Sequence, residues 1–426
     1  MLISYRMHSL KKLGAIGGAI ALTACWPLAV GQIAQTIVEN GIQQLNSEGV
    51  KAEVVEYDRS YFYAQAITRY TITDPLLAEN LEKDGLPTSI DVVHDISHGL
   101  LSIDAHSYVK DSKLVQFELA TQSKLNGDTD FELVGRKFNF TDSSGSELIV
   151  GEYSATGSAS ISGALDYQAS IPFSSVNFAN GDELVVSGFT AKGNGQKEQG
   201  IWIGEQKMDL AGISLKTVGG QNDFQLSELD YMITSVKAET GETFDNQQVL
   251  TIEEATSGEN VAKKVKLDFA FNGIRSDALE QLLSIYQSGA ELTPEKVEQS
   301  MPLLDQLVEA GLEVELNKFA VNLNGGDFQS AWKLVVPAGQ KNVSQNASIL
   351  LNVVEGKLDA HISNELLQAY PYVRENIDEL LIMEFATEGD KGVDLNANLN
   401  GGQVTFESGK QVPLLALFMP LMAGQR

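Results

Sequence analysis

Hydrophobic positions along the chain predict one long apolar helix followed by a body of β-strands. Residues 13–30, LGAIGGAIALTACWPLAV, contain no charged side chain and directly follow Lys11 and Lys12. Eighteen helical residues would be about 27 Å long, close to the ~30 Å thickness of the hydrocarbon core of a bilayer. The run therefore predicts a transmembrane anchor.

The distribution of basic residues predicts the orientation of this anchor. Arg6, Lys11 and Lys12 precede the apolar run, and no other Lys or Arg occurs before Lys51. By the positive-inside rule, residues 1–12 are expected on the cytoplasmic side of the membrane and the body on the opposite side. Met7 is an alternative start, because residues 8–12 retain both lysines.

Two other fates of the apolar run remain open. Leu22-Thr23-Ala24-Cys25 resembles a bacterial lipobox, in which Cys25 would carry the lipid, and a cleaved signal peptide is a third interpretation. The apolar run continues past Cys25 to Val30, which a lipoprotein does not need. This continuation favours a retained span.

Residues 31–48 show a helical pattern after the anchor. Ile33, Ala34, Ile37, Val38, Gly41, Ile42 and Leu45 form one broad apolar face at the 3.6-residue period, and Gly49 provides a stop. We expect an amphipathic juxtamembrane helix that either packs under the body or pairs with a second copy in a homodimer.

Residues 49–426 read as a β-rich body. Residues 51–74 form one long strand or two strands with a bend near Asp58, and strand patterns separated by polar turns continue to residue 267. Helical patterns occupy residues 276–311 and 363–382; Pro302 is expected to kink or divide the first region, and Pro371 to break or bend the second. The fold class is mainly β (α+β): a long, curved, mostly antiparallel sheet with a few covering helices. An apolar tail, residues 412–423, is expected to dock on the body or to contact a partner.

Glycine-containing segments predict the turns of this body. Turns are expected at residues 126–128, 180–182 and 193–195, and a β-bulge is expected near Asn317. Residues 322–328 and 398–404 share an Asn-Leu-Asn-Gly-Gly pattern. This echo indicates either a duplicated strand-turn-strand unit or the independent use of the same turn chemistry.

Composition limits the classes of partner. The formal charge is −27; Arg6, Lys11 and Lys12 contribute +3 to it, so residues 13–426 carry −30. Such a surface argues against electrostatic binding of nucleic acid or anionic headgroups. Cys25 is the only cysteine, which excludes an intrachain disulfide.

Three histidines and two nearby aspartates are the best candidates in the sequence for a metal-binding site. His94, His98 and His106, with Asp95 and Asp104, are residue types that could bind zinc. In a strand, however, His94 and His98 would lie about 13 Å apart, too far to share an ion. Histidines that are hydrogen-bonded within the fold are the simpler interpretation. No catalytic, cofactor-binding or metal-binding residues are assigned, and an enzyme is not expected.

Short motifs resemble those of a known family. Residues 57–62, YDRSYF, followed by residues 94–100, HDISHGL, resemble the YdgA-like family of bacterial envelope proteins of unknown function. In that family an Arg-Gly-x-Phe motif and a later His-Gly-Pro motif are typical, so the matching positions are Arg59, Phe62, His98 and Gly99. Ser60 replaces the glycine and Leu100 replaces the proline. The resemblance implies a single N-terminal anchor and a β-rich periplasmic body, and implies no reaction.

Together these patterns predict a membrane-anchored periplasmic protein with a binding or scaffolding role. The strand-rich body, its helices and a general plan similar to AsmA-like envelope proteins suggest a lipid-like or extended ligand in an apolar groove of the sheet. The alternatives are a structural or assembly partner in an envelope complex and, third, a metal-dependent enzyme.

Overall fold

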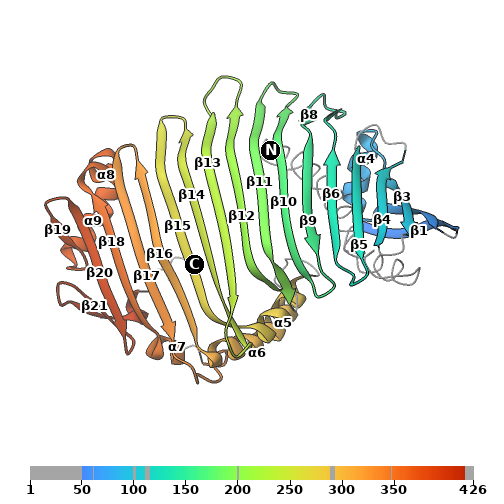
Figure 1. The fold of residues 1–426 in the computed structure, drawn as a ribbon. Coiled ribbons are helices and arrows are strands. Elements are labelled where there is room, and N and C mark those ends of the chain that lie inside the picture. Colours follow the sequence, from blue (N-terminus) through green and yellow to red (C-terminus); the bar gives the residue numbers. More distant parts are fainter. Residues whose placement is uncertain are drawn as a thin grey trace. The chain divides into compact units, whose positions relative to one another are not determined.

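The computed structural model describes residues 50–60, 62–98, 102–110, 116–198, 201–287, 293–346 and 348–417. This part of the chain is mainly β, with 22 strands and a few helices, and the strand pairings within each of its two compact units are antiparallel (Figure 1). The mainly-β, antiparallel prediction is therefore confirmed. The expected anchor at 13–30, with Cys25, and the expected helix at 31–48 lie outside the described residues.

The first compact unit contains residues up to 196 and residues 213–221, and the second contains 197–212 and 222–426. Each unit is described by itself. In the first unit, hydrogen-bonded neighbours follow the order β1, β2, β3, β4, β5, β6, β9, β10 and β11, and the short strands β7 and β8 pair with each other, with β8 also on β10. The elements are β1 Val50–Arg59, β2 Tyr63–Ile72, α4 Pro75–Lys83, β3 Ser89–His98, β4 Ser102–Val109, β5 Phe117–Lys124, β6 Thr129–Gly135, β7 Phe138–Thr141, β8 Glu147–Val150, β9 Tyr153–Ala159, β10 Ala164–Asn177 and β11 Glu183–Glu198.

The region 51–74 forms two strands and not one. β1 and β2 pair as a hairpin, in which Val50 lies opposite Ile72 and Arg59 opposite Ala64. The reversal occurs near the expected bend: the amide and the hydroxyl of Ser60 both donate hydrogen bonds to the carbonyl oxygen of Tyr63, at 2.7 and 2.9 Å. A polar side chain next to its own turn can satisfy the backbone in this way.

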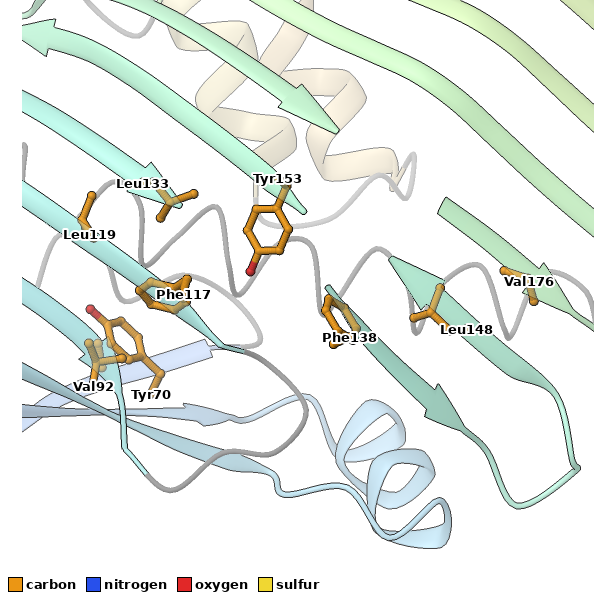
Figure 2. Close-up of a cluster of buried hydrophobic side chains, with 10 residues drawn as sticks. Tyr70, Val92, Phe117, Leu119, Leu133, Phe138, Leu148, Tyr153 and Val176 are labelled. Atoms are coloured by element: carbon orange, nitrogen blue, oxygen red, sulfur yellow. The ribbon is translucent and has the colours of Figure 1, made fainter. Parts of the chain in front are cut away.

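The strands of the first unit alternate buried and exposed residues, so that one face of its sheet is covered. In β5, FELATQSK, every second residue from Phe117 is buried and the others are exposed, which is the two-residue period of a strand with one covered face. The buried side chains form the cluster shown in Figure 2, with Leu119 and Val92 each only 1% exposed. Its members are Ala52, Tyr70, Val92, Phe117, Leu119, Leu133, Phe138, Leu148, Tyr153 and Val176.

Aromatic rings cover glycines on neighbouring strands of this face. The ring of Tyr153 lies over Gly135, where an added Cβ would be 1.9–2.2 Å from ring atoms. The ring of Tyr167 covers Gly193 on the paired strand β11 in the same manner. Glycine without a side chain leaves room for a ring from the adjacent strand. Residues 193–195 are strand residues of β11, and the turn predicted there is wrong; Gly193 leaves room for the ring of Tyr167 and does not reverse the chain.

The second unit has the strand order β13, β14, β15, β16, β17, β18, β20, β21 and β22, with β19 also paired to β20. The boundary between the units falls within β11 and β12. The elements are β12 Ile201–Lys216, β13 Phe224–Lys237, β14 Thr243–Ser257, β15 Asn260–Arg275, α5 Ser276–Gln287, α6 Pro294–Ala310, β16 Leu312–Leu323, β17 Gly326–Val336, α7 Ser348–Val353, β18 Glu355–Ser363, α8 Asn364–Ala369, α9 Pro371–Ile382, β19 Thr387–Gly389, β20 Gly392–Asn400, β21 Gln403–Phe406 and β22 Gln411–Pro413.

Two prolines act differently in the helices of this unit. α6 starts at Pro294 with the Thr293 hydroxyl capping the Lys296 amide, and it continues through Pro302 without a break. Of the two expected effects of Pro302, a kink or a division, the division does not occur. At Pro371 the prediction is correct: α8 ends at Ala369 and α9 begins at Pro371, because the proline ring excludes a continuous helical ladder.

α8 packs closely on the sheet where β17 begins. A Cβ on Gly326 would lie 2.3 Å from the backbone nitrogen of Leu366. The hydroxyl of Ser363 caps α8 at the Leu366 amide and also accepts a hydrogen bond from the amide of Asp327, at 2.9 Å. The absence of a side chain at Gly326 therefore fixes where this helix crosses the sheet.

The predicted bulge and the sequence echo both fall in the second unit. The register of β16 shifts on both of its sides between Leu316 and Lys318 or Phe319, which confirms a bulge at Asn317. The two echoed segments are the hairpin connections β16–β17 and β20–β21. Asn324 and Gly401 both have positive φ there, 49° and 54°, as tight hairpin turns require. Duplication and independent turn chemistry remain alternatives.

Candidate functional site

The exposed face of the first unit carries an open hollow lined by polar side chains. Neighbouring strands place Gln65 opposite Asp95, Asp95 opposite His106, and Asp104 opposite Gln122. Because alternate residues of a strand point to opposite faces, these side chains share the face turned away from the buried cluster. The hollow has a volume of about 700 Å³, and a second one of about 510 Å³ shares Asp95 and Ser97 with it.

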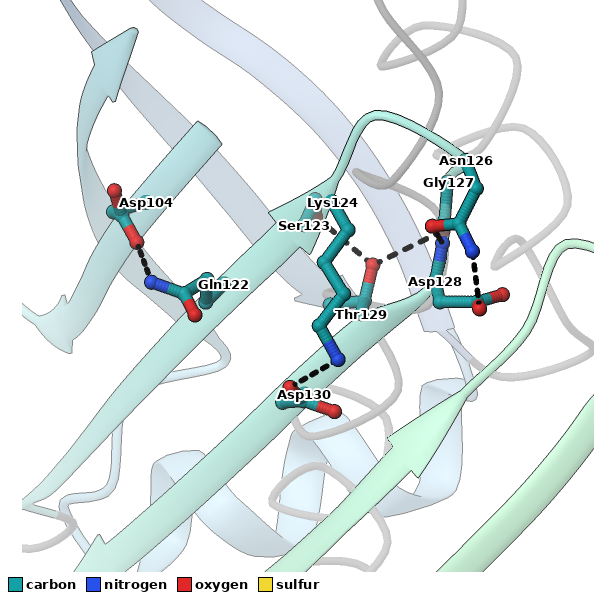
Figure 3. Close-up of polar contacts among 9 residues, drawn as sticks. All are labelled: Asp104, Gln122, Ser123, Lys124, Asn126, Gly127, Asp128, Thr129 and Asp130. Atoms are coloured by element: carbon teal, nitrogen blue, oxygen red, sulfur yellow. Dashed lines mark hydrogen bonds and ion pairs between the residues drawn. The ribbon is translucent and has the colours of Figure 1, made fainter. Parts of the chain in front are cut away.

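Cross-strand hydrogen bonds organise the carboxylates of this hollow (Figure 3). The side-chain amide of Gln122 donates to Asp104 at 2.8 Å, and the ammonium of Lys124 pairs with Asp130 at 2.8 Å. The hydrogen bond from Lys124 to Asp130 raises the pKa of that lysine above its ordinary value. Similarly, the amide of Gln65 donates to Asp95 at 2.7 Å. The hollow is thus rich in hydrogen-bond acceptors.

The turn between β5 and β6 fixes the register of these two strands, which both contribute residues to the hollow. The amide of Asp128 donates to the side-chain oxygen of Asn126 at 3.2 Å, and the Asn126 amide donates to the Asp128 carboxylate at 2.6 Å (Figure 3). Gly127 has φ of 85°, a region that favours glycine. The predicted turn at 126–128 is confirmed, and so is the one at 180–182, where Gly181 donates to Phe178.

The structure separates the histidines that the sequence grouped together. His94 is 2% exposed and lies on the buried face of β3, where its Nδ1 and Nε2 lie 2.7 Å from the Ser107 hydroxyl and 3.2 Å from the Thr68 hydroxyl. Burial lowers its pKa to about 3, so the imidazole is neutral at ordinary pH. His106 lies on the opposite, exposed face, 3.5 Å from Glu118.

Metal ligands are not assembled in the described part of the chain. Within residues 50–417, apart from the segments left out above, no group of three His, Cys, Asp or Glu side chains is placed to hold an ion. Asp95 and Asp104 share the exposed face with His106, but His94 points away from them. The sequence pattern could not show this, because it does not give the register that sets His106 opposite Asp95 and Ser107 opposite His94.

The family-motif positions lie at the ends of the first strands. Arg59 ends β1 and His98 ends β3, and Phe62 lies in the turn before β2 with 56% of its surface exposed. Gly99 and Cys25 fall outside the described residues. The backbone therefore places Arg59 and His98 close to one end of the same three-stranded ladder, β1, β2 and β3.

The second unit carries a different feature, an open apolar face. In β15, Leu267 and Phe269 alternate with the charged Lys266 and Asp268. Pairing continues the apolar row across the ladder, because Leu316 lies opposite both Phe269 and Trp332. We call this the apolar surface and define it by six residues: Leu250, Leu267, Phe269, Leu316, Trp332 and Leu334.

The apolar surface is only partly covered. Leu334 is 40% exposed and Leu267 is 36% exposed, and the other four members are half-buried. At its borders the strands are covered: α8 and α9 pack on Ile362, Val393 and Leu395. Leu414 and Leu417 pack against the buried cluster of Ala397, Val404 and Phe406, as do Leu358 and Leu399.

The other face of this ladder is polar. Lys333 pairs with Glu313 at 2.6 Å and with Glu315 at 2.5 Å, and these two carboxylates raise the pKa of the lysine. His361 lies 2.7 Å from Asp394 on the same side. One ladder therefore presents an ion-paired face and an apolar face. The sequence predicted an apolar groove but not its strands; the period-2 pattern in residues 265–271 and 330–334 is the signal that marks them.

No helix in the described residues is both long and apolar enough to cross a membrane. The predicted anchor at 13–30 precedes those residues, so the finding does not bear on it.

Comparison with known proteins identifies the family. Residues 10–414 match the family model described as "Bacterial protein of unknown function (DUF945)". Neither the curated proteins nor the solved structures contain a match. Because the family model covers nearly the whole chain, this protein belongs to the DUF945 family of bacterial proteins of unknown function.

Proposed function

We propose that this protein is anchored in the bacterial inner membrane and that its periplasmic body binds a lipid-like, long-chain ligand on the apolar surface. The observation that carries the proposal is the exposure of large apolar side chains in one continuous patch: Leu267 and Leu334 are each more than one third exposed beside Trp332 and Phe269. Contiguous exposed apolar patches commonly mark binding sites.

The chemistry of the patch selects the class of ligand. None of its six members carries a charge or a hydroxyl group, so it offers contact with methylene groups and little to a polar molecule. Strands lie about 4.8 Å apart, so the patch spans roughly 14 Å from β14 to β17. An extended acyl chain has the shape to lie across these strands. The acidic body argues against recognition of an anionic headgroup, so we assign binding to the chain of the ligand.

The proposed anchor would place such a site close to a source of long-chain ligands. A retained span at residues 13–30 holds the body beside the membrane from which a long-chain ligand would come. This part of the proposal rests on the sequence pattern, on membership of a bacterial family and on the resemblance of residues 57–62 and 94–100 to YdgA-like envelope proteins.

The proposal is tested by binding of a fluorescent long-chain fatty acid to the purified full-length protein in mild detergent. Leu334→Glu places a carboxylate in the patch and should weaken binding at least tenfold, because an ionised group would have to be desolvated beside the chain. Met232→Glu is the matched control: Met232 is 39% exposed, like Leu334, but lies in β13 on the opposite face.

The two variants separate the outcomes. Weaker binding by Leu334→Glu with unchanged binding by Met232→Glu supports the apolar surface as the site. Equal effects of both substitutions, or no binding by the unaltered protein together with no lipid in its organic extract, would exclude the proposal. Circular dichroism spectra of all three proteins should be superimposable, since both positions are exposed.

A further inference from the structure

Polar side chains border the apolar surface on the side of β13 and β14. Register places Tyr231 of β13 directly opposite Leu250, a member of the apolar surface. Gln248 of β14 lies directly opposite Phe269, another member. Directly opposed residues of neighbouring strands point to the same side of a sheet. Tyr231 and Gln248 therefore share one face with the apolar surface.

Tyr231 and Gln248 begin a series of hydrogen bonds between neutral groups. The hydroxyl of Tyr231 donates to the side-chain oxygen of Gln248 at 2.7 Å, and the Gln248 amide donates to the side-chain oxygen of Asn246 at 3.0 Å. The amide of Asn246 donates to the hydroxyl of Ser235 at 2.9 Å, and Ser235 is only 5% exposed. Hydrogen bonds in series orient and polarise one another. We call these four residues the polar cluster.

The polar cluster is uncharged but retains hydrogen-bonding capacity. Each side-chain amide has two N–H groups, and those of Gln248 and Asn246 each donate one within the cluster. Lys237, two residues beyond Ser235 in β13, is held in an ion pair with Glu198 at 2.5 Å. An ionised headgroup would lose water at the cluster and find no opposite charge among its four members. The cluster therefore suits neutral hydroxyl or carbonyl groups.

The polar cluster lies at one end of a row of opposed residues that crosses the apolar surface. Gln248 lies opposite Phe269, and Phe269 lies opposite Leu316. Leu316 in turn lies opposite Trp332, so the row has one residue on each of β14, β15, β16 and β17. The row is about 14 Å long, because it spans three strand spacings of about 4.8 Å. A ligand with its head at Gln248 would lay its acyl chain over the two aromatic rings and the leucine between them.

We propose that the apolar surface binds a lipid with a neutral, hydroxyl-bearing head, of the monoacylglycerol class, and that the polar cluster holds this head. The inference deepens the proposed function and rests on it. The hydroxyl groups of the head accept hydrogen bonds from the second N–H group of Gln248 or Asn246, whereas a fatty-acid anion would place its carboxylate beside an uncharged cluster. The cluster thus selects among long-chain ligands by the charge of the head.

The selection is tested by displacement of the bound fluorescent fatty acid from the full-length protein in alkaline buffer, in which oleate is ionised. Monooleoylglycerol and oleate carry the same acyl chain and differ only in their heads. Monooleoylglycerol should displace the probe at a concentration about tenfold lower than oleate, because its head enters the cluster without desolvation of a charge. Equal displacement by the two lipids, or stronger displacement by oleate, would overturn the inference.

The role of the polar cluster is tested by Gln248→Leu, which replaces the amide by an apolar side chain. The affinity for monooleoylglycerol should fall about tenfold and that for oleate should change less than about twofold. Retained binding of oleate shows that the variant is folded. Gln247→Leu is the matched control, because Gln247 is the next residue of β14 and donates to Asp268 on the opposite face, at 2.8 Å. It should leave the preference for monooleoylglycerol intact.

Tyr231→Phe is a milder second variant, because it removes only the hydroxyl that donates to Gln248. It should reduce the preference for monooleoylglycerol in the same direction as Gln248→Leu. Loss of the preference in Gln247→Leu as well, or full preference in both Gln248→Leu and Tyr231→Phe, would overturn the assignment of the head to the polar cluster.

Failure of this inference is distinguishable from failure of the proposed function. If Leu334→Glu leaves displacement by both lipids unchanged, the proposed function fails and the inference fails with it. If Leu334→Glu weakens the binding of both lipids, but the unaltered protein binds them equally, the apolar surface stands as a binding site and only the selection of a neutral head is excluded.

Discussion

Phe269 and Trp332 contact each other edge to face, with ring centroids 5.8 Å apart and an interplanar angle of 73°, although β16 lies between their strands. The two rings meet above Leu316, which pairs with both residues. This geometry places apolar side chains from three adjacent strands, two of them aromatic, on one side of the ladder, and it defines the centre of the apolar surface.

Replacement of Trp332 by Ala should lower the free energy of unfolding by about 1–3 kcal/mol, less than for a fully buried aromatic residue, because the ring is only half-buried. Chemical denaturation followed by circular dichroism gives the value. Gln329→Ala on the opposite face is the control and should change stability by less than about 0.5 kcal/mol. Similar losses for the two variants would contradict the packing described here.

Gly135→Ala should destabilise the first unit, because its Cβ would overlap the ring of Tyr153 at 1.9–2.2 Å. Forced movement of a packed ring costs roughly 1–3 kcal/mol, and thermal unfolding measures the loss. Gly389→Ala in β19 is the comparison, since its Cβ would meet only the Gly392 carbonyl oxygen at 3.8 Å. A Gly135→Ala protein as stable as Gly389→Ala would show that the ring does not cover the glycine.

Tyr153→Phe should be neutral or stabilising by up to about 1 kcal/mol, since a buried hydroxyl without a partner costs free energy. Its hydroxyl is buried and has no hydrogen-bond partner among the described residues, and burial raises the pKa of Tyr153 to about 12. Urea titrations of the two proteins give the difference. A loss above about 1 kcal/mol would mean that the hydroxyl is hydrogen-bonded in solution.

The buried, neutral imidazole of His94 should make the protein less stable in acid. Its folded-state pKa, about 3, is below the ordinary 6.5, so below pH 6.5 the unfolded chain binds a proton that the folded chain does not. The stability due to this group is complete above pH 6.5 and decreases as the pH falls toward 3, by about 1.4 kcal/mol per pH unit.

The contribution of His94 is measured by comparing how steeply the free energy of unfolding depends on pH in two proteins. Urea unfolding between pH 7 and pH 5 should show a smaller decrease for His94→Gln than for the unaltered protein, even if the variant is less stable at every pH. Carboxylates with lowered pKa values, such as Asp91 beside Arg69, act equally in both proteins. Parallel curves for the two proteins would contradict a buried, neutral imidazole.

The native N-terminus distinguishes the three fates of the apolar run. We expect intact-mass spectrometry of the membrane-extracted protein to show Lys11 and Lys12 retained and Cys25 unmodified, because the run continues to Val30. Cys25→Ser should then remain in the membrane fraction. A diacylglyceryl group on Cys25, or release of the Cys25→Ser protein, would establish the lipoprotein interpretation instead.

The sequence alone determined the β-rich class, the turns at residues 126–128 and 180–182, the bulge at Asn317 and the helix break at Pro371. Each depends on a few neighbouring residues whose backbone preferences are strong: glycine for positive φ, proline for its missing amide and fixed φ. Pro302 shows the limit of such rules, since α6 continues through it and packing in the folded chain decides whether a local preference prevails.

Only the tertiary structure decided which residues meet. His94 and His106 look like one cluster in the sequence but lie on opposite faces of β3 and β4, because one residue in a strand changes the side on which a group points. The apolar surface is likewise built from strands that start at Thr243 and end at Val336, and only their register aligns Leu267, Phe269 and Trp332. The residues of a possible site were visible in the sequence, but their sharing of one face depends on long-range pairing that no local pattern specifies.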